Sequence, residues 1–467
     1  MIALSIGEIE SIVAGTLVSS TQSPETIVSG SVQTDSRLVT TGSIFFALPG
    51  EETDGHLFAP AAQENGAALI ISERELELAA PQIVVANGVD ALGALAAAVV
   101  ARVRAENELS VVGITGSNGK TTTKNMLRAI LEAQGPTVAP QGSFNNQVGA
   151  PISMLGIDGA TRYLIVEMGA SGSGEIERLV RIARPDIGVV LKVGLAHVGE
   201  FGGIDAVQRA KTEMVRDLPA SAVAVLNADD DRVAAMAVET DARVRWFGLS
   251  DDAEVRAEDI QATASGTVFQ LVTPAGSTPV HLRILGEHHV SNALAALSVA
   301  EELGVDRDEA IAALEAVPRA ERWRMELLTP ADGIVVINDA YNASPDSTAA
   351  ALKTLAQILL PGQRSIAVLG EMAELGEYSD EEHDRIGRLA VRLNVQKLIV
   401  VGHGARHIHN AAGLEGSWDG ESVLVETPDE AYDLLKDDLR EGDVVLVKSS
   451  KSANLRFLGD RLGGVTA

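Results

Sequence analysis

The chain has 467 residues, which is enough for about three domains of ordinary size. It contains no cysteine, and this excludes disulfide scaffolds, thiolate metal sites and a cysteine nucleophile. The formal net charge of −28 argues against a nucleic acid or an anionic membrane as partner, because either needs a basic face, but it still allows a small phosphorylated substrate held by a few local cations.

The first hundred residues predict a small α/β unit. Residues 1–15 have no basic start, and two glutamates interrupt their apolar residues, so they are not a secretory signal and we expect a cytosolic protein. Residues 67–71 and 83–86 predict strands, and the Ala-rich residues 91–104 predict a long helix. The polar run at residues 105–108 then predicts a domain boundary after residue 107.

A second series of strands and helices follows. Short Val/Ile-rich runs alternate with helical patterns, which is typical of parallel sheets with crossover helices; the predicted strands are residues 109–114, 163–166, 187–193 and 222–226. Residues 266–272 and 280–284 flank a Pro/Gly-rich segment and predict an antiparallel hairpin at the sheet edge. A helix at about residues 290–303 closes this domain, and the next boundary is predicted near residues 317 and 318.

The third series is the most regular. Its predicted strands are residues 334–337, 366–369, 398–401 and 444–447, with helical patterns between them. This pattern predicts an open, doubly wound, Rossmann-like domain over residues 318–467, in which ligands bind beyond the carboxyl ends of the strands. The whole chain is therefore expected to be α/β with domains at 1–107, 108–317 and 318–467.

A glycine-rich loop joins the first strand of the second domain to a helix. Such a turn presents backbone N–H groups to phosphate, its lysine reaches the outer phosphates, and the following hydroxyl holds Mg2+. The residues concerned are Thr115, Gly116, Ser117, Asn118, Gly119, Lys120, Thr121 and Thr122. The spacing departs from the ordinary P-loop, because Ile114 stands where that motif has its first glycine.

Other candidate residues also follow predicted strands. Glu167 ends one strand and suits Mg2+, although a glutamate in that position is more often solvated. Asp339 follows a strand of the third domain, and Tyr341 and Asn342 behind it offer a stacking ring and a hydrogen-bonding amide for a nucleobase. Lys448 follows another strand with two serines and Lys451, a group that suits a carboxylate or a phosphate.

The loop is similar to the ATP-binding loop of the Mur ligases and the folylpolyglutamate synthases. The resemblance to the Mur ligase family then extends over nearly the whole chain. It includes Asp35-Ser36-Arg37, Asn145-Asn146, Glu167-Met168-Gly169, Ala196-His197, Asn338-Asp339-Ala340-Tyr341-Asn342, Gly370-Glu371-Met372-Ala373-Glu374-Leu375-Gly376 and Lys448-Ser449-Ser450. The last four segments resemble the branch of the family that adds D-alanyl-D-alanine.

The resemblance implies a function and its cofactors. The expected enzyme uses ATP and two Mg2+ ions to join D-alanyl-D-alanine to a UDP-N-acetylmuramoyl tripeptide through an acyl phosphate, in the synthesis of peptidoglycan precursors. It implies a UDP-binding first domain, an ATPase second domain and a third domain that closes on the second. The partners are small molecules, and we expect a monomer.

The resemblance also implies roles for single residues. Lys120, Glu167, His197 and Lys211 would be catalytic, and Thr121, Glu167, His197 and a carbamylated Lys211 would hold the metal ions. Asn292, Asp339, Tyr341 and Asn342 would contact adenine and ribose, although Asn292 also suits a helix cap. An arginine is expected nearby, and the register favours Arg322 over Arg319 and Arg324. A lone histidine or a helix lysine is otherwise most often structural or exposed.

The UDP-linked substrate is expected at the first domain. The resemblance assigns it Asp35, Ser36, Arg37, Phe46, Asn145 and Asn146, with Arg37 paired to the diphosphate. A salt bridge within the loop is an equally good interpretation of Asp35 and Arg37 from the sequence alone.

Two other functions stay open. A sister ligase would add a diamino acid to the dipeptide precursor, but the Asp-x-Pro-Arg type of motif expected of it is not found in the last domain. A P-loop nucleotide switch is the alternative from a different class, and the absence of a guanine-recognition Asn-Lys-x-Asp motif and the altered glycine spacing argue against it.

Overall fold

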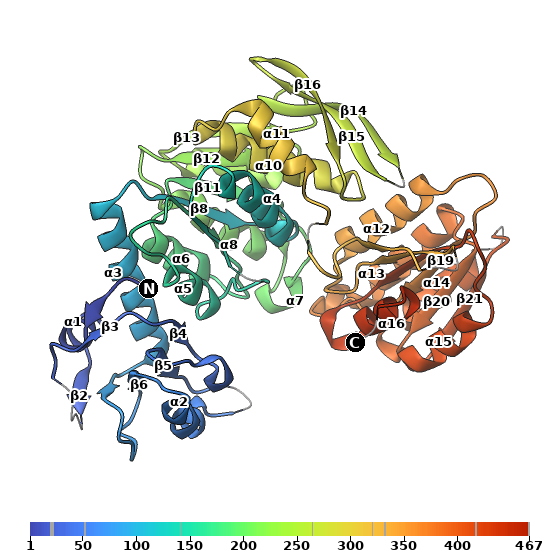
Figure 1. Ribbon diagram of the computed structural model, residues 1–467. Helices are drawn as coiled ribbons and strands as arrows, with labels where there is room; N and C mark the ends of the chain where they lie inside the picture. The colour runs from blue at the N-terminus through green and yellow to red at the C-terminus, as the bar shows by residue number, and fades with distance from the viewer. Residues whose placement is uncertain are drawn as a thin grey trace.

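The computed structural model describes residues 1–18, 23–50, 53–140, 142–263, 265–319, 321–330, 333–415 and 418–465. Three units follow one another along the chain, and the central unit lies between the N-terminal unit (blue) and the C-terminal unit (orange and red) (Figure 1). Each unit is built on a mainly parallel sheet of its own, so the α/β class predicted from the sequence is confirmed. The predicted boundaries fall at the end of one long helix, α3, and in the segment between α11 and β17.

The N-terminal unit contains a five-stranded sheet of order β2-β7-β6-β5-β4, in which only β2 is antiparallel to its neighbour. Its strands are β2 (Thr16–Val18), β4 (Val32–Gln33), β5 (Ile44–Ala47), β6 (Leu69–Ser72) and β7 (Gln82–Val84), with β1 (Leu4–Ser5) and β3 (Ile27–Val28) paired separately. Its helices are α1 (Ile6–Ile12), α2 (Ala59–Glu64) and α3 (Gly88–Glu106), and η1 (Ser36–Leu38) and η2 (Gly55–Phe58) are 3-10 turns.

The longest helix of this unit connects it to the central one. The side chain of Asn87 caps α3 by accepting a hydrogen bond from the backbone N–H of Asp90. From there α3 runs to Glu106 and contacts α1 of its own unit and α5 (Gly149–Met154) and α6 (Glu175–Ala183) of the next. The predicted helix at residues 91–104 is confirmed and is longer at both ends.

The central unit contains a nine-stranded sheet of order β16-β15-β14-β13-β12-β11-β8-β10-β9. The strands are β8 (Ser110–Thr115), β9 (Thr137–Val138), β10 (Tyr163–Glu167), β11 (Ile187–Val190), β12 (Val223–Asn227), β13 (Arg243–Gly248), β14 (Val255–Thr263), β15 (Gly266–Thr273) and β16 (Gly276–Leu282). Strands β8 to β14 are parallel to one another. Strand β15 is antiparallel to both β14 and β16.

Helices cover both faces of this sheet. One face is covered by α4 (Lys120–Glu132), α10 (His288–Glu302) and α11 (Arg307–Glu315). The other is covered by α5, α6 and α8 (Ile204–Arg216), with the short helices α7 (Val198–Phe201) and α9 (Asp231–Ala234) nearby. Because β8 is buried on both sides, its sequence is one continuous apolar run, and this made it recognisable.

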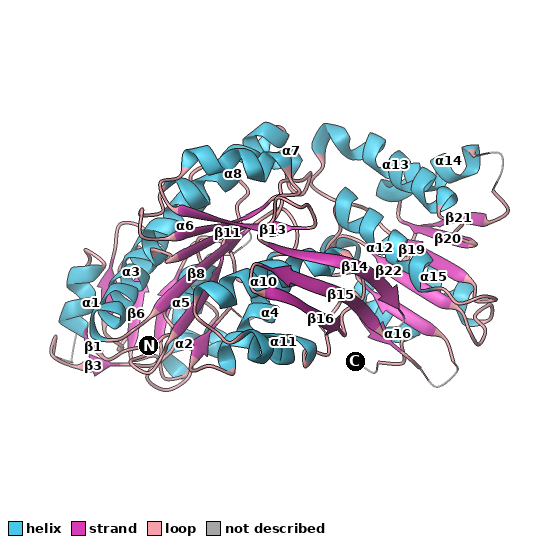
Figure 2. Cartoon of the chain, turned by 90° about the horizontal axis from the view of Figure 1, so that it is seen from above, coloured by secondary structure: helices cyan, strands magenta, loops and turns pink. Residues whose placement is uncertain are grey.

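The edge of the central sheet differs in detail from the prediction. The hairpin is confirmed, but its turn is shorter, and a further strand, β14, pairs with β15 and contacts α12 (Pro345–Ile358) of the C-terminal unit (Figure 2). The helix predicted at residues 290–303 is α10, but it does not close the unit, because α11 follows it.

The C-terminal unit contains a six-stranded sheet of order β17-β18-β22-β19-β20-β21. Its strands are β17 (Glu326–Leu328), β18 (Val335–Asn338), β19 (Ser365–Leu369), β20 (Lys397–Val401), β21 (Glu421–Val425) and β22 (Val444–Lys448), and only β17 is antiparallel. Helices α12, α13 (Ser379–Arg392) and α14 (Arg406–Leu414) cover one face, and α15 (Pro428–Lys436) and α16 (Leu455–Leu462) cover the other. The predicted doubly wound domain is confirmed.

The strand ends of the last two units bring the candidate residues together. Strands β11, β8 and β10 are neighbours, so Thr115, Glu167 and the segment after Val190 lie at one edge of the central sheet. Strands β18, β22 and β19 are neighbours as well, so the segments after Asn338, Lys448 and Leu369 share an edge of the C-terminal sheet. Among the described residues, no helix is long and apolar enough to cross a membrane.

Candidate active site

A cavity of about 370 Å³ lies between the central and C-terminal units. Thirteen of the residues predicted for a site line it: Ser117, Asn118, Gly119, Lys120, Thr121, Thr122, Asn145, Glu167, His197, Asn292, Asp339, Tyr341 and Asn342. Residues that the sequence did not assign to the site also line it, among them Ser143, His288, His289, Arg324, Ser344 and Glu374. The two sheet edges therefore form one shared site.

The glycine-rich loop has the backbone that a phosphate site needs. Gly116 has a φ of 153° and Gly119 a φ of 88°, and Gly119 directly precedes α4. A Cβ atom on Gly119 would lie 2.3 Å from Oδ1 of Asn292, so only glycine fits where Asn292 lies against the loop. The side chain of Ser117 accepts a hydrogen bond from the N–H of Gly194 at 2.9 Å, which ties the loop to the segment after β11.

Lys120 is folded back over this loop. Its Nζ donates to the carbonyl oxygen of Gly116 at 2.6 Å. Burial lowers the pKa of Lys120 below its usual range, the Glu167 carboxylate opposes this shift, and the Arg324 guanidinium adds to it. A phosphate bound at the helix start would give the ammonium group a stronger partner than a carbonyl.

Glu167 lies beside the first hydroxyl of α4. Thr121 Oγ1 donates to the two carboxylate oxygens of Glu167 at 3.0 and 3.2 Å, and Asn145 Nδ2 donates to one of them at 2.8 Å. The Glu167 side chain is 1% exposed, so it is held by these partners and not by water. A hydroxyl and a carboxylate in contact form an oxygen donor set of the kind that Mg2+ prefers.

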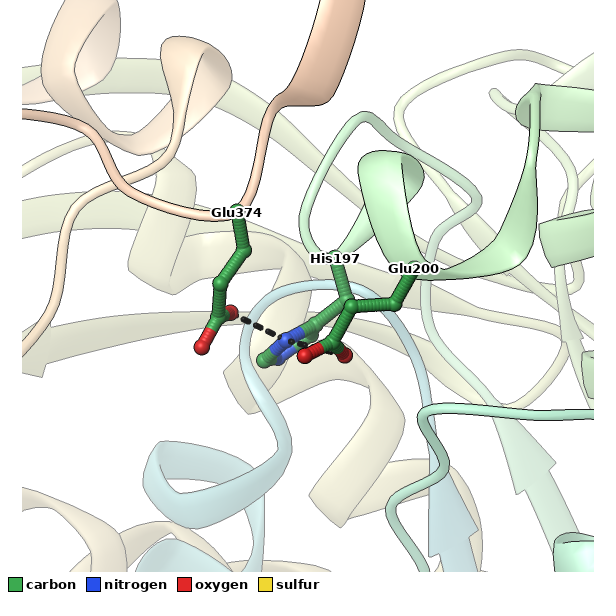
Figure 3. A group of neighbouring side chains, drawn as sticks. All are labelled: His197, Glu200 and Glu374. Atoms are coloured by element: carbon green, nitrogen blue, oxygen red, sulfur yellow. Dashed lines mark ion pairs between the residues drawn. The ribbon is translucent and has the colours of Figure 1, made fainter.

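His197 lies at the start of α7 with a left-handed backbone, φ 61°. Its Nδ1 lies 2.5 Å from Oε2 of Glu374 and 3.7 Å from Oε2 of Glu200 (Figure 3). These three side chains offer ligand atoms that all lie within 4.8 Å of one another. Burial lowers the pKa of His197, Glu374 opposes this, and the ammonium groups of Lys120 and Lys211 lower the pKa further.

Lys211 lies behind this group on α8. Its side chain is buried, and its ammonium group makes no hydrogen bond or ion pair with any described residue. Burial lowers the pKa of Lys211 to about 7, and the charge on Lys120 acts in the same direction. The residue does not line the cavity but influences the pKa of His197, which does.

The C-terminal unit contributes a buried ion pair. Nζ of Lys448 lies 2.6 Å from Oδ2 of Asp339, and Asp339 Oδ1 accepts from the N–H of Met325 at 3.0 Å. Lys448 is 2% exposed and also donates to the carbonyl of Asn342 at 3.1 Å. Asp339 is thus held in place at the cavity wall.

Hydrogen bonds join the two units around the cavity. The hydroxyls of Ser143 and Tyr341 lie 2.5 Å apart, and Ser344 Oγ, which also caps α12, lies 3.0 Å from Oδ1 of Asn118. The guanidinium of Arg324 donates to Thr121 Oγ1 at 3.3 Å and lies 4.3 Å from the centre of the Tyr341 ring. One face of that ring is therefore covered by an arginine.

The arginine at the cavity is Arg324 and not Arg322, which the register had favoured. Arg322 points away and pairs with Asp460 at 3.0 Å, while Arg319 pairs with Glu326. Trp323 and Met325 both have positive φ, so the chain turns at each of them and the alternation of side chains is broken.

Two histidines at the start of α10, of which His289 is buried and His288 half-buried, were not predicted for the site. Burial lowers the pKa of His288 to about 4 and that of His289 well below its usual range, so both rings are neutral. The His289 Nδ1 lies 3.1 Å from Nδ2 of Asn292. Asn292 was expected to cap or to contact a ligand, and its side chain lies between His289 and Gly119.

Several predicted residues lie away from the cavity. Arg37 is 86% exposed and pairs with Asp35 at 2.6 Å, which is the loop salt bridge considered above, and Ser36 is in the 3-10 turn between them. Phe46 is fully buried in the core of the N-terminal unit, so its side chain contacts no ligand; the apolar run belongs to strand β5. Asn146 Oδ1 accepts hydrogen bonds from the N–H groups of Val148 and Gly149 at the start of α5, whereas Asn145 belongs to the cavity.

Buried polar atoms without a partner indicate that the cavity accepts a polar ligand. Within the described residues, Nδ2 of Asn118, Nε of Arg324 and Nε2 of His289 are buried and make no hydrogen bond. Buried donors without partners are rare because each one costs free energy. All three residues line this cavity.

The sequence matches three consecutive domain families. Residues 30–112 match the Mur ligase family catalytic domain, residues 114–300 the Mur ligase middle domain, and residues 323–451 the Mur ligase glutamate ligase domain. A UDP-N-acetylmuramoyl-tripeptide–D-alanyl-D-alanine ligase of Mycobacterium leprae is 42% identical, and the alignment covers 99% of each chain.

Solved structures of similar proteins agree with this family assignment. The MurF of Acinetobacter baumannii superposes with a TM-score of 0.89 at 32% identity, over 99% of each chain. The MurF ligase of Thermotoga maritima, solved in complex with ADP, superposes with a TM-score of 0.82 at 28% identity, over 94% of this chain and 98% of that one. With the three domain families in order and a relative of this identity over its full length, the chain belongs to the Mur ligase family.

Proposed function

We propose that the protein is an ATP-dependent ligase that joins D-alanyl-D-alanine to a UDP-N-acetylmuramoyl tripeptide. The observation that carries this proposal is the full-length similarity to relatives of that name, combined with a cavity in which the glycine-rich loop faces the C-terminal unit. We further propose that it acts in the cytosol as a monomer on small-molecule substrates.

The residues present fit ATP and Mg2+. The unpartnered donors of Asn118 and Arg324 suit phosphate oxygens, and the two neutral histidines suit the uncharged part of the nucleotide. Thr121 and Glu167 would hold one Mg2+, and His197 with a carbamylated Lys211 would hold a second. When bound, Mg2+ supplies positive charge that offsets the charge on the transferring phosphoryl group.

The protein's own groups mainly position reactants and stabilise charge. The terminal carboxylate of the tripeptide attacks the γ-phosphorus of ATP, the bond to the bridging oxygen breaks and ADP leaves, while Lys120 balances the charge that develops there. The amine of D-alanyl-D-alanine then attacks the carbonyl carbon of the resulting acyl phosphate, loses a proton, and phosphate leaves. Asp339, Tyr341, Asn342 and Asn292 would hold the nucleoside, with Arg324 taking the role that the sequence had suggested for Arg322.

Lys211 is proposed to act as a carbamate. The ammonium group first loses a proton, the neutral amine then attacks the carbon of CO2, an N–C bond forms as one C=O π bond opens onto oxygen, and a second proton is released, so that a cation becomes an anion. A carbamate forms only on the neutral amine, and the pKa of about 7 makes that form accessible near neutral pH.

The UDP moiety is proposed to bind beside β4. Asp35, Ser36 and Arg37 follow this strand, and the carboxyl ends of parallel strands are the usual place for ligands. Arg37 would exchange its bond to Asp35 for the diphosphate. Asn145 and Asn146, on the segment before α5, would meet the peptide part of the substrate near Glu167.

Phosphate release across a matrix of substrates tests this function. We expect turnover only when the UDP-muramoyl tripeptide and D-alanyl-D-alanine are both present with ATP and Mg2+. Efficient turnover with the dipeptide precursor and a diamino acid would instead assign the protein to the sister ligases. ATP hydrolysis that needs no acceptor amine would exclude both ligase activities.

A further inference from the structure

A segment of the C-terminal unit contacts the central unit at His197. Residues 370–376 follow β19, and Glu374 from this segment lies with Oε2 2.5 Å from Nδ1 of His197 (Figure 3). Both side chains line the cavity and are partly exposed to it, Glu374 to 45% and His197 to 35%. The contact therefore lies at the surface where a ligand binds and not in a sealed core.

The segment that carries Glu374 is fixed to its own unit. The N–H of Met372 donates to Nε2 of the buried His383 at 3.0 Å, and the N–H of Ala373 donates to Oγ of Ser450 at 2.8 Å. The N–H of Ser450 in turn donates to the carbonyl of Glu371 at 2.9 Å. Because these bonds hold the backbone directly before Glu374, the position of the Glu374 carboxylate follows the position of the whole C-terminal unit.

The backbones of the two units also meet at this point. The N–H of Gly199 donates to the carbonyl oxygen of Glu374 at 3.0 Å. A Cβ atom on Gly199 would lie 2.6 Å from the backbone nitrogen of Gly376, so the approach requires glycine. Helix α7 and residues 374–376 are thus in direct backbone contact, and the ion pair is part of a docked interface.

The position of Glu374 selects one form of the His197 ring. A neutral imidazole carries a hydrogen on one nitrogen only, and the nitrogen next to a carboxylate oxygen is the one that donates. Nδ1 then carries the hydrogen, and Nε2 keeps its lone pair. A carboxylate in this position fixes the tautomer and the orientation of a ligating histidine and raises its basicity.

We propose that Glu374 is a positioning residue that prepares Nε2 of His197 to bind a divalent cation, and that it does so only while the C-terminal unit is docked on α7. Docking and cation binding are then coupled, because each stabilises the arrangement that the other needs. The inference rests on the proposed function only for the role of His197 as a cation ligand; the preparation of the ring is independent of any substrate.

Glu200 is the competing partner for His197. It is three residues further along the chain, and its Oε2 lies 3.7 Å from the same Nδ1. That distance is too long for a hydrogen bond, and Glu200 belongs to the central unit, so its position does not report docking. Glu200→Ala is therefore a matched variant that removes a carboxylate from the same group of side chains without removing the contact between units.

The first measurement is made on the protein without nucleotide or metal. Nitrogen-15 NMR of the histidine rings at pH 8, with the His197 signals assigned by their loss in His197→Gln, distinguishes the two tautomers. We expect a hydrogen on Nδ1 in the wild type, in Glu200→Ala and in Glu377→Ala; Glu377 is an exposed glutamate directly after the segment and has no described partner. Glu374→Ala is expected to shift the ring to the Nε2–H form or to a mixture of the two.

The second measurement is Mn2+ binding followed by electron paramagnetic resonance in the presence of a non-hydrolysable ATP analogue. Glu374→Ala is expected to weaken Mn2+ binding roughly ten- to a hundredfold, the range found for such outer partners of metal-ligating histidines. Glu374→Gln keeps an acceptor for Nδ1 without the charge, so it should keep the tautomer and lose less affinity. The control Glu377→Ala should bind Mn2+ as the wild type does.

An unchanged His197 tautomer in Glu374→Ala overturns the proposal. So does a changed tautomer in Glu377→Ala, because the effect would then come from a disturbed fold. If Glu374→Ala changes the tautomer but binds Mn2+ with unchanged affinity, the coupling to cation binding is overturned. Failure of the proposed ligase reaction is recognised separately, in the phosphate-release assay, and leaves the result on the metal-free protein as it stands.

Discussion

Burial makes three lysines near the phosphate end of the site easier to deprotonate than an exposed lysine. Burial lowers the pKa of Lys120, Lys124 and Lys211, all on the two helices α4 and α8. They differ in their partners, since Lys120 bonds one loop carbonyl and Lys124 bonds the carbonyls of Pro140 and Gly142, while Lys211 bonds no described group. Three residues of the same type therefore suit three different roles: Lys120 phosphate binding, Lys124 the anchoring of a loop, and Lys211 chemical modification.

Replacing Lys120 tests the first of these roles. Lys120→Ala should lower kcat by on the order of a thousandfold, because a cation that meets the transferring phosphoryl group is lost. Lys192→Ala is the control, since Lys192 follows β11 close to the loop but does not line the cavity, and among the described residues its ammonium group pairs with Asp346 alone, at 3.7 Å. Steady-state phosphate release measures both, and a Lys120→Ala enzyme within tenfold of the wild type would contradict the assignment.

Lys211 is expected to give the activity a dependence on pH and CO2. Its pKa of about 7 lies below the usual lysine value of 10.5, so the folded protein binds fewer protons than the unfolded chain between these values. Stability therefore rises with pH across this window, and the unfavourable effect of the buried charge is fully present below about pH 7. At equal concentrations of dissolved CO2, enzyme depleted of CO2 should regain activity faster at pH 8 than at pH 6.

A chemical substitute separates the carbamate from other roles of Lys211. Lys211→Ala should lose most activity, and acetate or propionate should restore part of it, because a small carboxylate replaces the missing anion. Rescue by added amines would show that the lysine acts as a cation. A nearly fully active Lys211→Ala enzyme would contradict the carbamate.

At the scale of elements, the sequence predicted those that are buried on both faces. Continuous apolar runs identified β8, β10 and β18, and the loop between β8 and α4 followed from its glycines and lysine. Strand β14 was missed because it is largely polar and bulged, with Asp259 at positive φ, so it has neither an apolar run nor a clean alternation. The run containing Phe46 was assigned to a ligand because a buried strand and an apolar binding segment have the same composition.

The segment before β17 shows why one site residue could not be predicted. Side chains alternate only along an extended chain, and the positive φ values of Trp323 and Met325 break that pattern. Counting from a motif therefore selected Arg322, whereas the turns direct Arg324 to Thr121 and Tyr341. The histidines of α10 were missed for a related reason, since the burial of a helix start is set by the neighbouring unit.

Two arginines of this segment provide a matched pair. Arg324→Ala should lower kcat/KM for ATP by roughly tenfold or more, since a charged hydrogen-bond donor at the cavity is lost. Arg322→Ala should change it little, because Arg322 does not line the cavity and pairs with Asp460 instead. Initial rates at varied ATP decide between them, and the opposite order of effects would restore the assignment to Arg322.

At the scale of the whole molecule, the site exists only where two units meet. The contacts Ser143 to Tyr341, Asn118 to Ser344 and Thr121 to Arg324 span residues about two hundred positions apart in the chain. Strand patterns predict each sheet edge separately, but they say nothing about how two folded units face each other. The shared cavity was therefore expected from the family resemblance alone, and its wall residues Ser143, Ser344 and Glu374 were not assigned.

A bound nucleotide should therefore protect both units together. We expect a non-hydrolysable ATP analogue with Mg2+ to slow amide hydrogen exchange both in residues 116–122 and in residues 339–347, because both segments line the cavity. Asp339→Ala should keep the protection of the first segment and lose that of the second, since it removes the partner of the buried Lys448 and of the Met325 N–H.

Asp433→Ala is the control for this experiment. Asp433 belongs to the same unit but lies on α15, where it pairs with the exposed Lys436, so both segments should stay protected in this variant. Hydrogen exchange followed by mass spectrometry resolves the two segments in one experiment. Protection confined to residues 116–122 in the wild type would mean that the nucleotide binds the central unit alone, and Asp339 and Tyr341 would then have no part in holding it.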